Sequence, residues 1–447
     1  MGKRKRLTQR HREYEGHKGM QKFNIPIPSV PFVPPCEVFF LRNLPRQNYK
    51  MCYTVKVEKP EKAATYSVAA LCAVGAEKAV SNEIKKMGLS VADSGFGRVR
   101  FRADIAGLYH ALMGLRAADR VLLEAAVFPA ADFDALFEGA RNVPWENLVP
   151  AHMGFKVDKV RSNRSRLKAE TSIQSVVHKA AADRLCTAYG LTRLPEEGRA
   201  TGAPVAEVRV YVEKDMVSLL LDLSGEPLYK RGYRKEGGIA PLRETTAAAM
   251  LLLSGWKRKY PLYDPFCGSG TILIEALMYA GDMAPGLGRR FALSDLLIAD
   301  NAVEETVRNE LRDRINFERT IRIAGSDEDA KSVSIASSNI ERLKKIHPDI
   351  QTTPVELKTL PMKEAQSSSP SGFIVTNPPY GKRLGDPSAS ERLYGDMAAL
   401  GRHFPQWKLA VITDHPGFES FFGRKANSCR EIKGGPIPAC FFQYEGL

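Results

Sequence analysis

The spacing of hydrophobic and polar residues predicts alternating helices and strands in the first half of the chain. Apolar residues recur with helical periodicity over residues 76–87 and 105–115, and a third helix is predicted over residues 172–189. The turn at residues 95–97 is followed by residues 98–101, where polar and apolar side chains alternate as in a half-buried strand. This mixture predicts an α+β module.

The pattern changes in the second half of the chain. Before the change, a strand is predicted around residues 155–157, and residues 208–212 and 217–223 form the arms of a predicted hairpin. From about residue 226 the order becomes strand, glycine turn, helix and strand, which is typical of a doubly wound parallel sheet. The second half is therefore predicted to be an α/β domain.

Residues 1–62 differ in composition from the rest of the chain. Five prolines between residues 25 and 35 oppose helix formation and strand pairing. The segment also carries 14 Lys and Arg residues against 5 Asp and Glu residues. We expect a basic extension outside the core, followed by the α+β module over residues 63–225 and the α/β domain over residues 226–447.

Charge favours one class of partner. The chain of 447 residues has a formal net charge of +14, and a basic surface attracts polyanions and speeds their encounter. Nucleic acid is therefore the favoured partner. For the basic extension taken alone, a solubilising tail is an equally good interpretation.

The cysteines, histidines and apolar runs indicate which compartment and which kinds of cofactor the sequence favours. The seven cysteines are scattered without a CxxC pair, which argues against a disulfide framework and a zinc knuckle, and the eight histidines show no HxxxH spacing. No apolar run approaches the ~18 residues of a membrane span. We expect a cytoplasmic protein with no metal site and no membrane partner.

Six basic residues gather between the predicted strand around residues 155–157 and the helix that follows. Side chains placed between these elements can converge on a phosphate backbone, although a solvated loop has the same composition. The predicted RNA-binding residues are Lys156, Lys159, Arg161, Arg164, Arg166 and Lys168.

The first chemical signal is a strand that ends in a glycine-rich turn at residues 262–271. Ligands of open α/β sheets bind beyond the carboxyl ends of the strands, and Gly268 and Gly270 would let the backbone approach such a ligand. The turn is neither GxGxxG nor a triphosphate loop, so it predicts a ligand without phosphates. Asp264 is expected to accept a hydrogen bond from a ligand ammonium, or to cap the turn. For Cys267 a packed thiol is favoured over a nucleophile.

The second signal is a short apolar strand that ends in Asp327 and Glu328. An acid at the end of the second strand is where such folds hold the ribose hydroxyls of an adenosine. Gly270 and Asp327 are 57 residues apart, whereas roughly 20 residues usually separate these two features. The sequence therefore predicts an insertion over about residues 281–318.

The third and most specific signal is an apolar strand that runs directly into Asn377, Pro378, Pro379 and Tyr380. The prolines fix φ and remove donors, which leaves rigid carbonyl acceptors, and Asn377 adds a side-chain carbonyl. Accepting both N–H bonds of an exocyclic base amine would favour a pyramidal nitrogen whose lone pair points at an electrophile. Tyr380 would stack on an extruded base. These four residues are the predicted catalytic residues, and a structural turn is the alternative.

With the glycine turn, the acid and Asn-Pro-Pro-Tyr in this order, the chain resembles the THUMP-domain class I RNA methyltransferases, specifically the bacterial 23S rRNA guanine-N2 methyltransferases. In the larger enterobacterial member, this activity is the N-terminal half of a fused protein. The resemblance runs from about residue 66 to the C-terminus. It includes shorter stretches at residues 221–225, 231–234, 239–245 and 284–287, the last of which lies inside the insertion.

The resemblance implies a ferredoxin-like segment with a THUMP RNA-binding module, over about residues 104–224, and then a Rossmann-like domain that binds S-adenosylmethionine. The implied reaction is methyl transfer to N2 of a guanine in 23S rRNA or in a large-subunit precursor. Residues 377–380 would hold the target base. Lys358 stands near where the family tends to place an adenine-contacting Asp, so no residue is assigned to the adenine. The implied cofactor-binding residues lie in the glycine turn and at the second strand end: Asp264, Phe266, Cys267, Gly268, Ser269, Gly270, Asp327 and Glu328.

Three other functions fit parts of the same pattern. Asn-Pro-Pro-Tyr serves any exocyclic amine, so an adenine-N6 methyltransferase is an alternative. THUMP modules also occur in tRNA-modifying enzymes, so tRNA is a second possible target. A non-catalytic RNA-binding factor of ribosome assembly would keep the fold and the basic residues without turnover.

Overall fold

A computed structural model gives the arrangement of the chain. Residues 61–447 form one compact unit, and a single cluster of buried hydrophobic side chains extends from Val68 to Phe441. The predicted extension over residues 1–62 lies outside the described residues. The structure describes residues 65–195, 204–234, 242–317, 322–350, 355–379, 387–434 and 438–447.

The first module begins with a βαββαβ unit in which the strands pair in the order β2-β3-β1-β4. All of these pairs are antiparallel. This order is that of the ferredoxin-like fold, which confirms the predicted segment. The elements are β1 (Tyr66–Cys72), α1 (Glu77–Lys86), β2 (Ser90–Gly95), β3 (Arg98–Ala103), α2 (Ile105–Gly114) and β4 (Ala118–Pro129).

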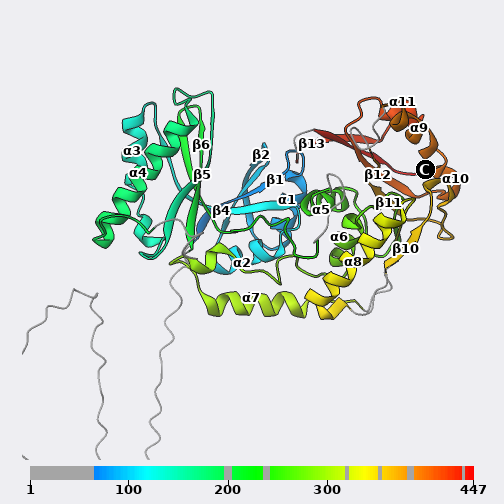
Figure 1. Ribbon diagram of the computed structural model, residues 1–447, viewed down its shortest axis with the longest axis horizontal. Coiled ribbons are helices and arrows are strands. Elements are labelled where there is room, and N and C mark those ends of the chain that lie inside the picture. Colours follow the sequence, from blue (N-terminus) through cyan, green and yellow to red (C-terminus); the bar gives the residue numbers. More distant parts are fainter. Residues whose placement is uncertain are drawn as a thin grey trace, which may run out of the picture. The chain divides into compact units, whose positions relative to one another are not determined.

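Three more strands extend the same sheet. β4 pairs with β7, and the sheet continues through β6 to β5, which gives seven strands among the described residues (Figure 1). β5 and β6 are parallel, and α4 connects them. The predicted hairpin and long helix are therefore present. The added elements are α3 (Phe133–Arg141), β5 (Gly154–Asn163), α4 (Glu170–Tyr189), β6 (Val205–Glu213) and β7 (Met216–Asp222).

The two faces of this first sheet differ in chemistry because side chains alternate along each strand. In β3, Val99 and Phe101 are buried in the main core, while Arg98 and Arg100 point to the other face. Helices α1 and α2 pack on the core face. The opposite face carries a small apolar cluster that contains Leu122, and basic residues of several strands lie on it.

The second sheet has seven strands in the order β10-β9-β8-β11-β12-β14-β13. The first five are parallel, and β14 runs antiparallel between β12 and β13. The strand order reverses between β8 and β11, which is the topological switch point where such sheets bind ligands. The strands are β8 (Leu262–Asp264), β9 (Ile323–Asp327), β10 (Val355–Thr359), β11 (Phe373–Thr376), β12 (Lys408–Thr413), β13 (Ser428–Ile432) and β14 (Ala439–Tyr444).

Helices flank the second sheet and complete the predicted doubly wound domain. α6 follows β8 directly, and α8 connects β9 to β10. α9 and α11 pack against each other beside β12 (Figure 1). These helices are α5 (Glu244–Leu253), α6 (Thr271–Ala280), α8 (Ala330–Ile346), α9 (Pro387–Met397), α10 (Leu400–His403) and α11 (Phe418–Phe422).

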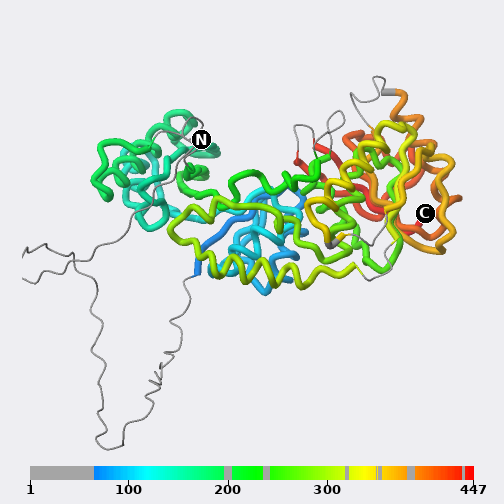
Figure 2. Tube along the Cα trace, turned by 60° about the horizontal axis from the view of Figure 1, so that its bottom comes forward, coloured from blue at the N-terminus to red at the C-terminus, as the bar shows by residue number. Residues whose placement is uncertain are grey.

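The predicted insertion between the glycine turn and the acid lies between α6 and β9. It contains α7 (Asn301–Asp313), which packs against α2 of the first module (Figure 2). The backbone of the insertion is also hydrogen-bonded to the first module, since Gly286 N donates to Met113 O at 2.8 Å and Leu293 N donates to Leu223 O at 3.0 Å. The insertion therefore holds the two sheets together. None of the helices that the structure describes is long and apolar enough to cross a membrane.

Candidate functional site

Three sequence signals meet at one edge of the second sheet. Asp264 ends β8, Asp327 ends β9 and Thr376 ends β11, and these strands are neighbours. Carboxyl ends of parallel strands lie at the same edge, so residues far apart in sequence converge there. The structure thus brings the glycine turn, the predicted ribose acid and Asn377 to the switch point.

Asp264 is a buried carboxylate with fixed partners. It is 1% exposed, and its Oδ1 accepts hydrogen bonds from the hydroxyl of Thr376 at 2.6 Å and from the backbone N–H of Phe266 at 3.1 Å. Burial raises the pKa of Asp264 to about 7, and the charge of Asp327 acts in the same direction, while the two hydrogen bonds oppose it. A cationic group placed nearby would favour the ionised form.

The glycine turn keeps a backbone conformation that other residues adopt with strain. Gly268 and Gly270 have φ values of +51° and +79°. A Cβ on Gly270 would lie 3.0 Å from the Cβ of Ala336 in α8, whereas one on Gly268 would meet no atom within 4 Å. Asn339 of α8 fixes the turn further, because its Nδ2 donates to Ser269 O at 3.0 Å. The turn is therefore packed on one side and open at Gly268.

Asp327 is tied to the glycine turn across the sheet edge. Its Oδ2 accepts a hydrogen bond from Gly268 N at 2.9 Å, and its Oδ1 accepts one from Asp329 N at 3.1 Å. Each carboxylate oxygen has two acceptor sites, so both can accept a further hydrogen bond from a ligand hydroxyl. The neighbouring Glu328 is exposed.

Cys267 behaves as a packing residue. It is 5% exposed and belongs to the main hydrophobic core. Burial raises the pKa of its thiol, and the charges of Asp264 and Asp327 raise it further. The thiol is therefore protonated at neutral pH, which argues against a nucleophilic role. Phe266 is half-buried and packs against the second core cluster.

Asn377 has a buried side-chain oxygen without a partner. Its Oδ1 is inaccessible to solvent and accepts no hydrogen bond from the described residues. A buried acceptor left unpaired costs free energy, so it marks a position where a ligand donor would be stabilising. Pro378 is buried and Pro379 is half-buried. Tyr380, the fourth predicted catalytic residue, lies outside the described residues.

The polar groups of this site suit S-adenosylmethionine. Asp264 offers a buried carboxylate to a cationic amino acid portion, the open backbone at Gly268 allows close approach, and Asp327 keeps acceptor capacity for ribose hydroxyls. The individual contacts of these residues stay predictions. In the described part of the chain, no group of three or more His, Cys, Asp or Glu side chains could hold a metal ion.

The predicted RNA-binding residues are not all in a loop. Lys156, Lys159 and Arg161 lie within β5, so the expectation that they follow the strand was wrong. The strand was predicted around residues 155–157 but was made too short, because its register shifts between Val157 and Lys159 and breaks the alternation that identifies a strand. Their role in RNA binding stays a prediction.

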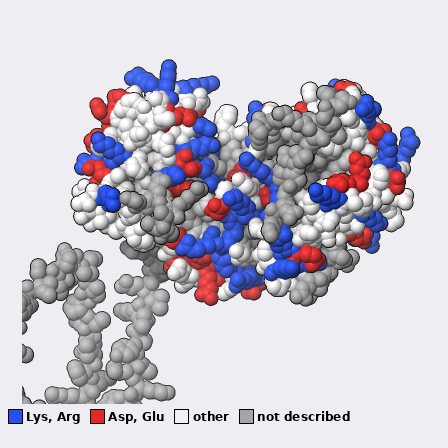
Figure 3. Space-filling model, in the orientation of Figure 1, with Lys and Arg blue, Asp and Glu red and all other residues white. Residues whose placement is uncertain are grey.

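The structure places five of these six residues, all except Lys156, in two hollows. Lys159 and Arg161 line a hollow on the outer face of the first sheet. Arg164, Arg166 and Lys168 line another, with Asp215, at the end of β5. Asp215 accepts a 2.8 Å hydrogen bond from Arg166 N. Lys and Arg side chains crowd the end of the part that holds β5 and β6, at the upper left of Figure 3.

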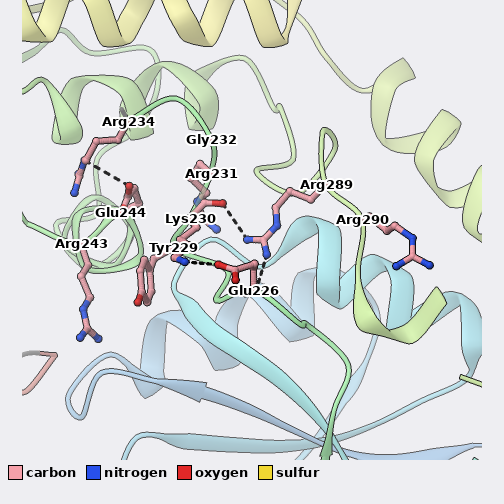
Figure 4. Close-up of a pocket in the computed structure, with 10 residues that line it drawn as sticks. All are labelled: Glu226, Tyr229, Lys230, Arg231, Gly232, Arg234, Arg243, Glu244, Arg289 and Arg290. Carbon is pink, nitrogen blue, oxygen red and sulfur yellow. Dashed lines mark hydrogen bonds and ion pairs between the residues drawn. The ribbon is translucent and has the colours of Figure 1, made fainter. Parts of the chain in front are cut away.

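A further hollow of about 670 Å³ is rich in arginine. Residues between β7 and the start of α5 line it together with Arg289 and Arg290 of the insertion. Figure 4 shows Arg234 turned toward Glu244, and Arg289 turned toward Glu226. Arg289 donates to Glu226 O at 2.6 Å, and Arg234 donates to Thr271 Oγ1 at 2.6 Å. Since Thr271 is the first residue of α6, this hollow is connected to the glycine turn.

Some residues of the site had no recognisable sequence signal. Thr376 and Asn339 contact Asp264 and Ser269 from elements 112 and 70 residues away. Thr376 immediately precedes Asn377, so its place at a buried strand end could have suggested a partner on the neighbouring strand. Asn339 sits among helical residues and is fully buried, and only the fold reveals its partner.

Comparison with known proteins identifies the two parts of the chain. Residues 231–440 match the RMKL-like methyltransferase domain, and residues 67–122 match the RlmL ferredoxin-like domain. The Bacillus subtilis (strain 168) protein YpsC, named as a candidate RNA methyltransferase, is 33% identical over 85% of this chain and 96% of its own length. The ribosomal RNA large subunit methyltransferase K/L of Syntrophotalea carbinolica is 32% identical over 83% of this chain. This chain spans 52% of that relative.

Solved structures agree with this assignment. The crystal structure of SMU.472, a candidate methyltransferase complexed with SAH, has a TM-score of 0.77 at 34% identity and covers 86% of this chain and 98% of its own. A protein of Listeria monocytogenes named as a predicted N6-adenine-specific DNA methylase has the same TM-score, identity and coverage of this chain, with 97% of its own covered. The chain therefore belongs to the RMKL-like methyltransferase family, and its cofactor is S-adenosylmethionine.

Proposed function

We propose that the protein methylates N2 of a guanine in 23S rRNA, as free RNA or within a large-subunit precursor, in the cytoplasm. The observation that carries this proposal is the buried Oδ1 of Asn377, directly after β11, which accepts no hydrogen bond from any residue that the structure describes. This acceptor follows Thr376, whose hydroxyl is bonded to Asp264 on the neighbouring strand. An acceptor for an amine N–H thus stands beside the predicted cofactor turn.

The chemistry follows from the position of these groups. The lone pair of an exocyclic amine is delocalised into its ring, so the amine is a weak nucleophile. Asn377 Oδ1 would accept one N–H bond and orient the nitrogen, and the rigid Asn-Pro-Pro backbone would accept the other. Bound S-adenosylmethionine supplies an electrophilic methyl group. The acceptors favour positive charge on the nitrogen as the new bond forms, which is electrostatic catalysis.

Two observations support RNA as the substrate. One relative carries RNA methyltransferase in its name and another carries ribosomal RNA large subunit methyltransferase. The net charge of +14 favours a polyanionic substrate as well. The choice of 23S rRNA and of guanine N2 goes beyond these names, and for that reason the target nucleoside is what the experiment has to identify.

One alternative has a specific observation in its favour. The Listeria monocytogenes structure is named for adenine N6, and Asn377 would accept an N–H of that amine equally well. Adenine-N6 methylation is therefore the second candidate function. A tRNA target and a binding-only role are distinguished from the main proposal by the same experiment.

The test uses the full chain and an Asn377→Ala variant. Each is incubated with labelled S-adenosylmethionine and total RNA from a strain that lacks the enzyme, and the digested RNA is analysed for methylated nucleosides and for the labelled RNA species. We expect N2-methylguanosine in 23S rRNA from the wild type, and transfer reduced roughly 100-fold or more in the variant. Asn82→Ala, at an exposed position of α1, is the matched control.

Each other outcome changes the proposal in a defined way. N6-methyladenosine would replace guanine with adenine, and label in tRNA would replace the ribosomal substrate. Should free RNA accept no methyl group, ribosomal precursor particles are tested next. Cofactor binding without transfer to either substrate would overturn the enzymatic proposal. Equilibrium dialysis of S-adenosylmethionine with the Asn377→Ala variant separates lost chemistry from lost cofactor binding.

A further inference from the structure

The outer face of the first sheet is strongly basic. The hollow on this face has a volume of about 800 Å³, and seven Lys and Arg residues line it against two acidic residues, Asp119 and Glu213. We call it the sheet-face hollow. Its cations come from four strands of the sheet, β3, β4, β5 and β6, and include Arg98, Arg100, Arg120, Lys159, Arg161 and Arg209.

The alternation of side chains explains why these cations gather on one face. β3 and β6 bury their apolar residues in the core, so Arg98, Arg100 and Arg209 lie on the opposite side. The helices α1 and α2 pack on the core side and leave this face uncovered by the described helices. The result is a row of guanidinium groups across the sheet.

Acidic neighbours compensate this charge only in part. Five of the seven cations pair with a carboxylate: Arg100, Arg120, Arg161, Arg209 and Arg243. Arg98 and Lys159 form no ion pair with the described residues. The Nε of Arg209 is buried and has no hydrogen-bond partner among the described residues, whereas the Nε of Arg100 lies 3.3 Å from the carboxylate of Glu124. Buried donors without partners are stabilised by an acceptor such as a phosphate oxygen.

Repulsion between the cations points in the same direction. The pKa of Arg98 is lowered by burial and by the charge of Arg100. The pKa of Lys159 is lowered by burial and by the charges of Arg161 and Arg209. A bound polyanion would relieve this repulsion, because it places negative charge among groups that now repel one another.

Aromatic side chains accompany these cations. Phe96, in the turn between β2 and β3, lines the hollow, is 97% exposed and has a φ of +51°. The guanidinium of Arg98 lies 5.6 Å from the ring centroid of Tyr211. An exposed aromatic ring beside a basic groove is the arrangement on which unpaired bases stack.

The sheet-face hollow leads toward the methyltransferase site. Tyr229 and Arg243 line both this hollow and the arginine-rich hollow of Figure 4. The guanidinium of Arg243 lies 5.1 Å from the ring centroid of Tyr229. Arg234, in the second hollow, donates to Thr271 next to the glycine turn. The two basic hollows are therefore adjacent, and Arg234 of the second contacts the residue that follows the glycine turn.

We propose that a single-stranded segment of the substrate RNA binds in the sheet-face hollow, with its phosphates on the guanidinium and ammonium groups and an unpaired base stacked on Phe96. This assignment rests on the proposed RNA methyltransferase function and adds the surface that holds the substrate. It extends the predicted RNA contacts of Lys159 and Arg161 to residues of β3, β4 and β6.

The test measures affinity for a fluorescent, mixed-sequence single-stranded oligoribonucleotide of about 20 nucleotides and for the corresponding duplex. The full chain is compared with Phe96→Ala and with Arg98→Glu/Lys159→Glu. Lys86→Glu, an exposed charge reversal on α1 at the core side of the sheet, is the control. We expect Phe96→Ala to weaken single-strand binding roughly tenfold at an unchanged salt dependence. The double variant should lose roughly one unit or more of the slope of log affinity against log salt.

The two proposals fail in different ways. If both sheet-face variants bind the single strand as tightly as Lys86→Glu does, the proposed RNA-binding surface is wrong, even if the wild type methylates RNA. Equal losses for single strand and duplex in Phe96→Ala would overturn the stacked single strand. Loss of binding in the variants without methyl transfer by the wild type would instead overturn the enzymatic function. Unchanged S-adenosylmethionine binding by calorimetry shows that each variant is folded.

Discussion

The hydroxyl of Thr376 donates a 2.6 Å hydrogen bond to Oδ1 of Asp264, across the topological switch point of the second sheet. One strand end leads into the glycine turn and the other leads into Asn377. Both side chains are buried. This hydrogen bond, together with the pairing of β8 and β11, therefore fixes the position of the predicted base-binding residues relative to the predicted cofactor carboxylate.

Removing that hydroxyl should weaken cofactor binding. In Thr376→Val, Asp264 loses a donor that favours its ionised form, so its pKa rises further. Hydrogen bonds to charged groups contribute about 1.5–3 kcal/mol, so we expect the affinity for S-adenosylmethionine at pH 7 to fall roughly tenfold in calorimetry. Thr376→Ser keeps the hydroxyl and should bind within about twofold of the wild type. Equal affinities of the Val and Ser variants would contradict this role.

Cofactor affinity should depend on pH through Asp264. Its pKa is about 7 in the free protein, and the cationic cofactor favours the carboxylate over the neutral acid. The affinity should therefore fall by close to tenfold for each pH unit below about 7, as measured by calorimetry between about pH 5.5 and 7.5. Asp264→Asn should bind more weakly and show little pH dependence over this range. The same pH dependence in the Asn variant would mean that another group titrates.

The same carboxyl has the opposite effect on stability. Its folded-state pKa of about 7 lies above the ordinary value of 3.8 for an aspartate, so the stabilisation it contributes is complete below about pH 4 and is lost as the pH rises to about 7. Without cofactor, Asp264→Asn should therefore gain stability relative to the wild type between these pH values. Urea unfolding at both ends of the range measures this difference, and a constant difference would rule out the shift.

The two glycines of the turn should respond differently to substitution. Both have positive φ, which costs a non-glycine residue about 1 kcal/mol. Gly270→Ala also brings a Cβ within 3.0 Å of Ala336, so we expect it to lose about 1–3 kcal/mol more in urea unfolding than Gly268→Ala. Gly268→Ala meets no protein atom within 4 Å and should mainly weaken cofactor binding. Equal unfolding free energies of the two variants would show that α8 shifts at Ala336 and accommodates the added Cβ without cost.

The site was predictable where local sequence carried its chemistry. Glycines after a strand, acids after the next strand and Asn-Pro-Pro after a third are visible as short motifs, and parallel strands place their carboxyl ends at one edge. Their convergence at Asp264, Asp327 and Asn377 therefore followed from the order of the motifs. The insertion was predicted from the spacing alone. Its contacts with Met113 and Leu223 required the structure.

The basic surface was predicted only in part for a physical reason. β5 contains a register shift after Val157, so its Lys and Arg residues did not alternate as in a regular strand. The alternation in β3 was recognised, but pattern alone does not say which strands lie beside it. Only the order β3-β1-β4-β7-β6-β5 brings Arg98 and Lys159 to the same hollow.

A buried arginine joins the two sheets and should be a major determinant of stability. The guanidinium of Arg116 donates to Met283 O in the insertion at 2.6 Å, while the carboxylate of Glu83 accepts the backbone N–H groups of Arg116 and Ala117 at 2.9 and 3.1 Å. Arg116 and Glu83 are each 8% exposed. Burial raises the pKa of Glu83, and the charge of Arg116 opposes that shift. The arginine thus helps to keep a buried carboxylate ionised.

The charge of Arg116 acts on the carboxyl group of Glu83 without a direct ion pair between the two side chains. Removing one of two interacting buried charges leaves the other uncompensated, which costs about 3–5 kcal/mol. We expect Arg116→Ala to lower the free energy of unfolding by this amount in urea titrations. Arg402→Ala, at an exposed position of α10, should change it by less than about 0.5 kcal/mol. Adding Glu83→Gln to Arg116→Met removes the orphaned charge but keeps a side-chain acceptor, so the double variant should be more stable than Arg116→Met alone. If the changes in the free energy of unfolding caused by the two substitutions are strictly additive, the two charges do not interact. The stability lost in the arginine variants would then be due to packing.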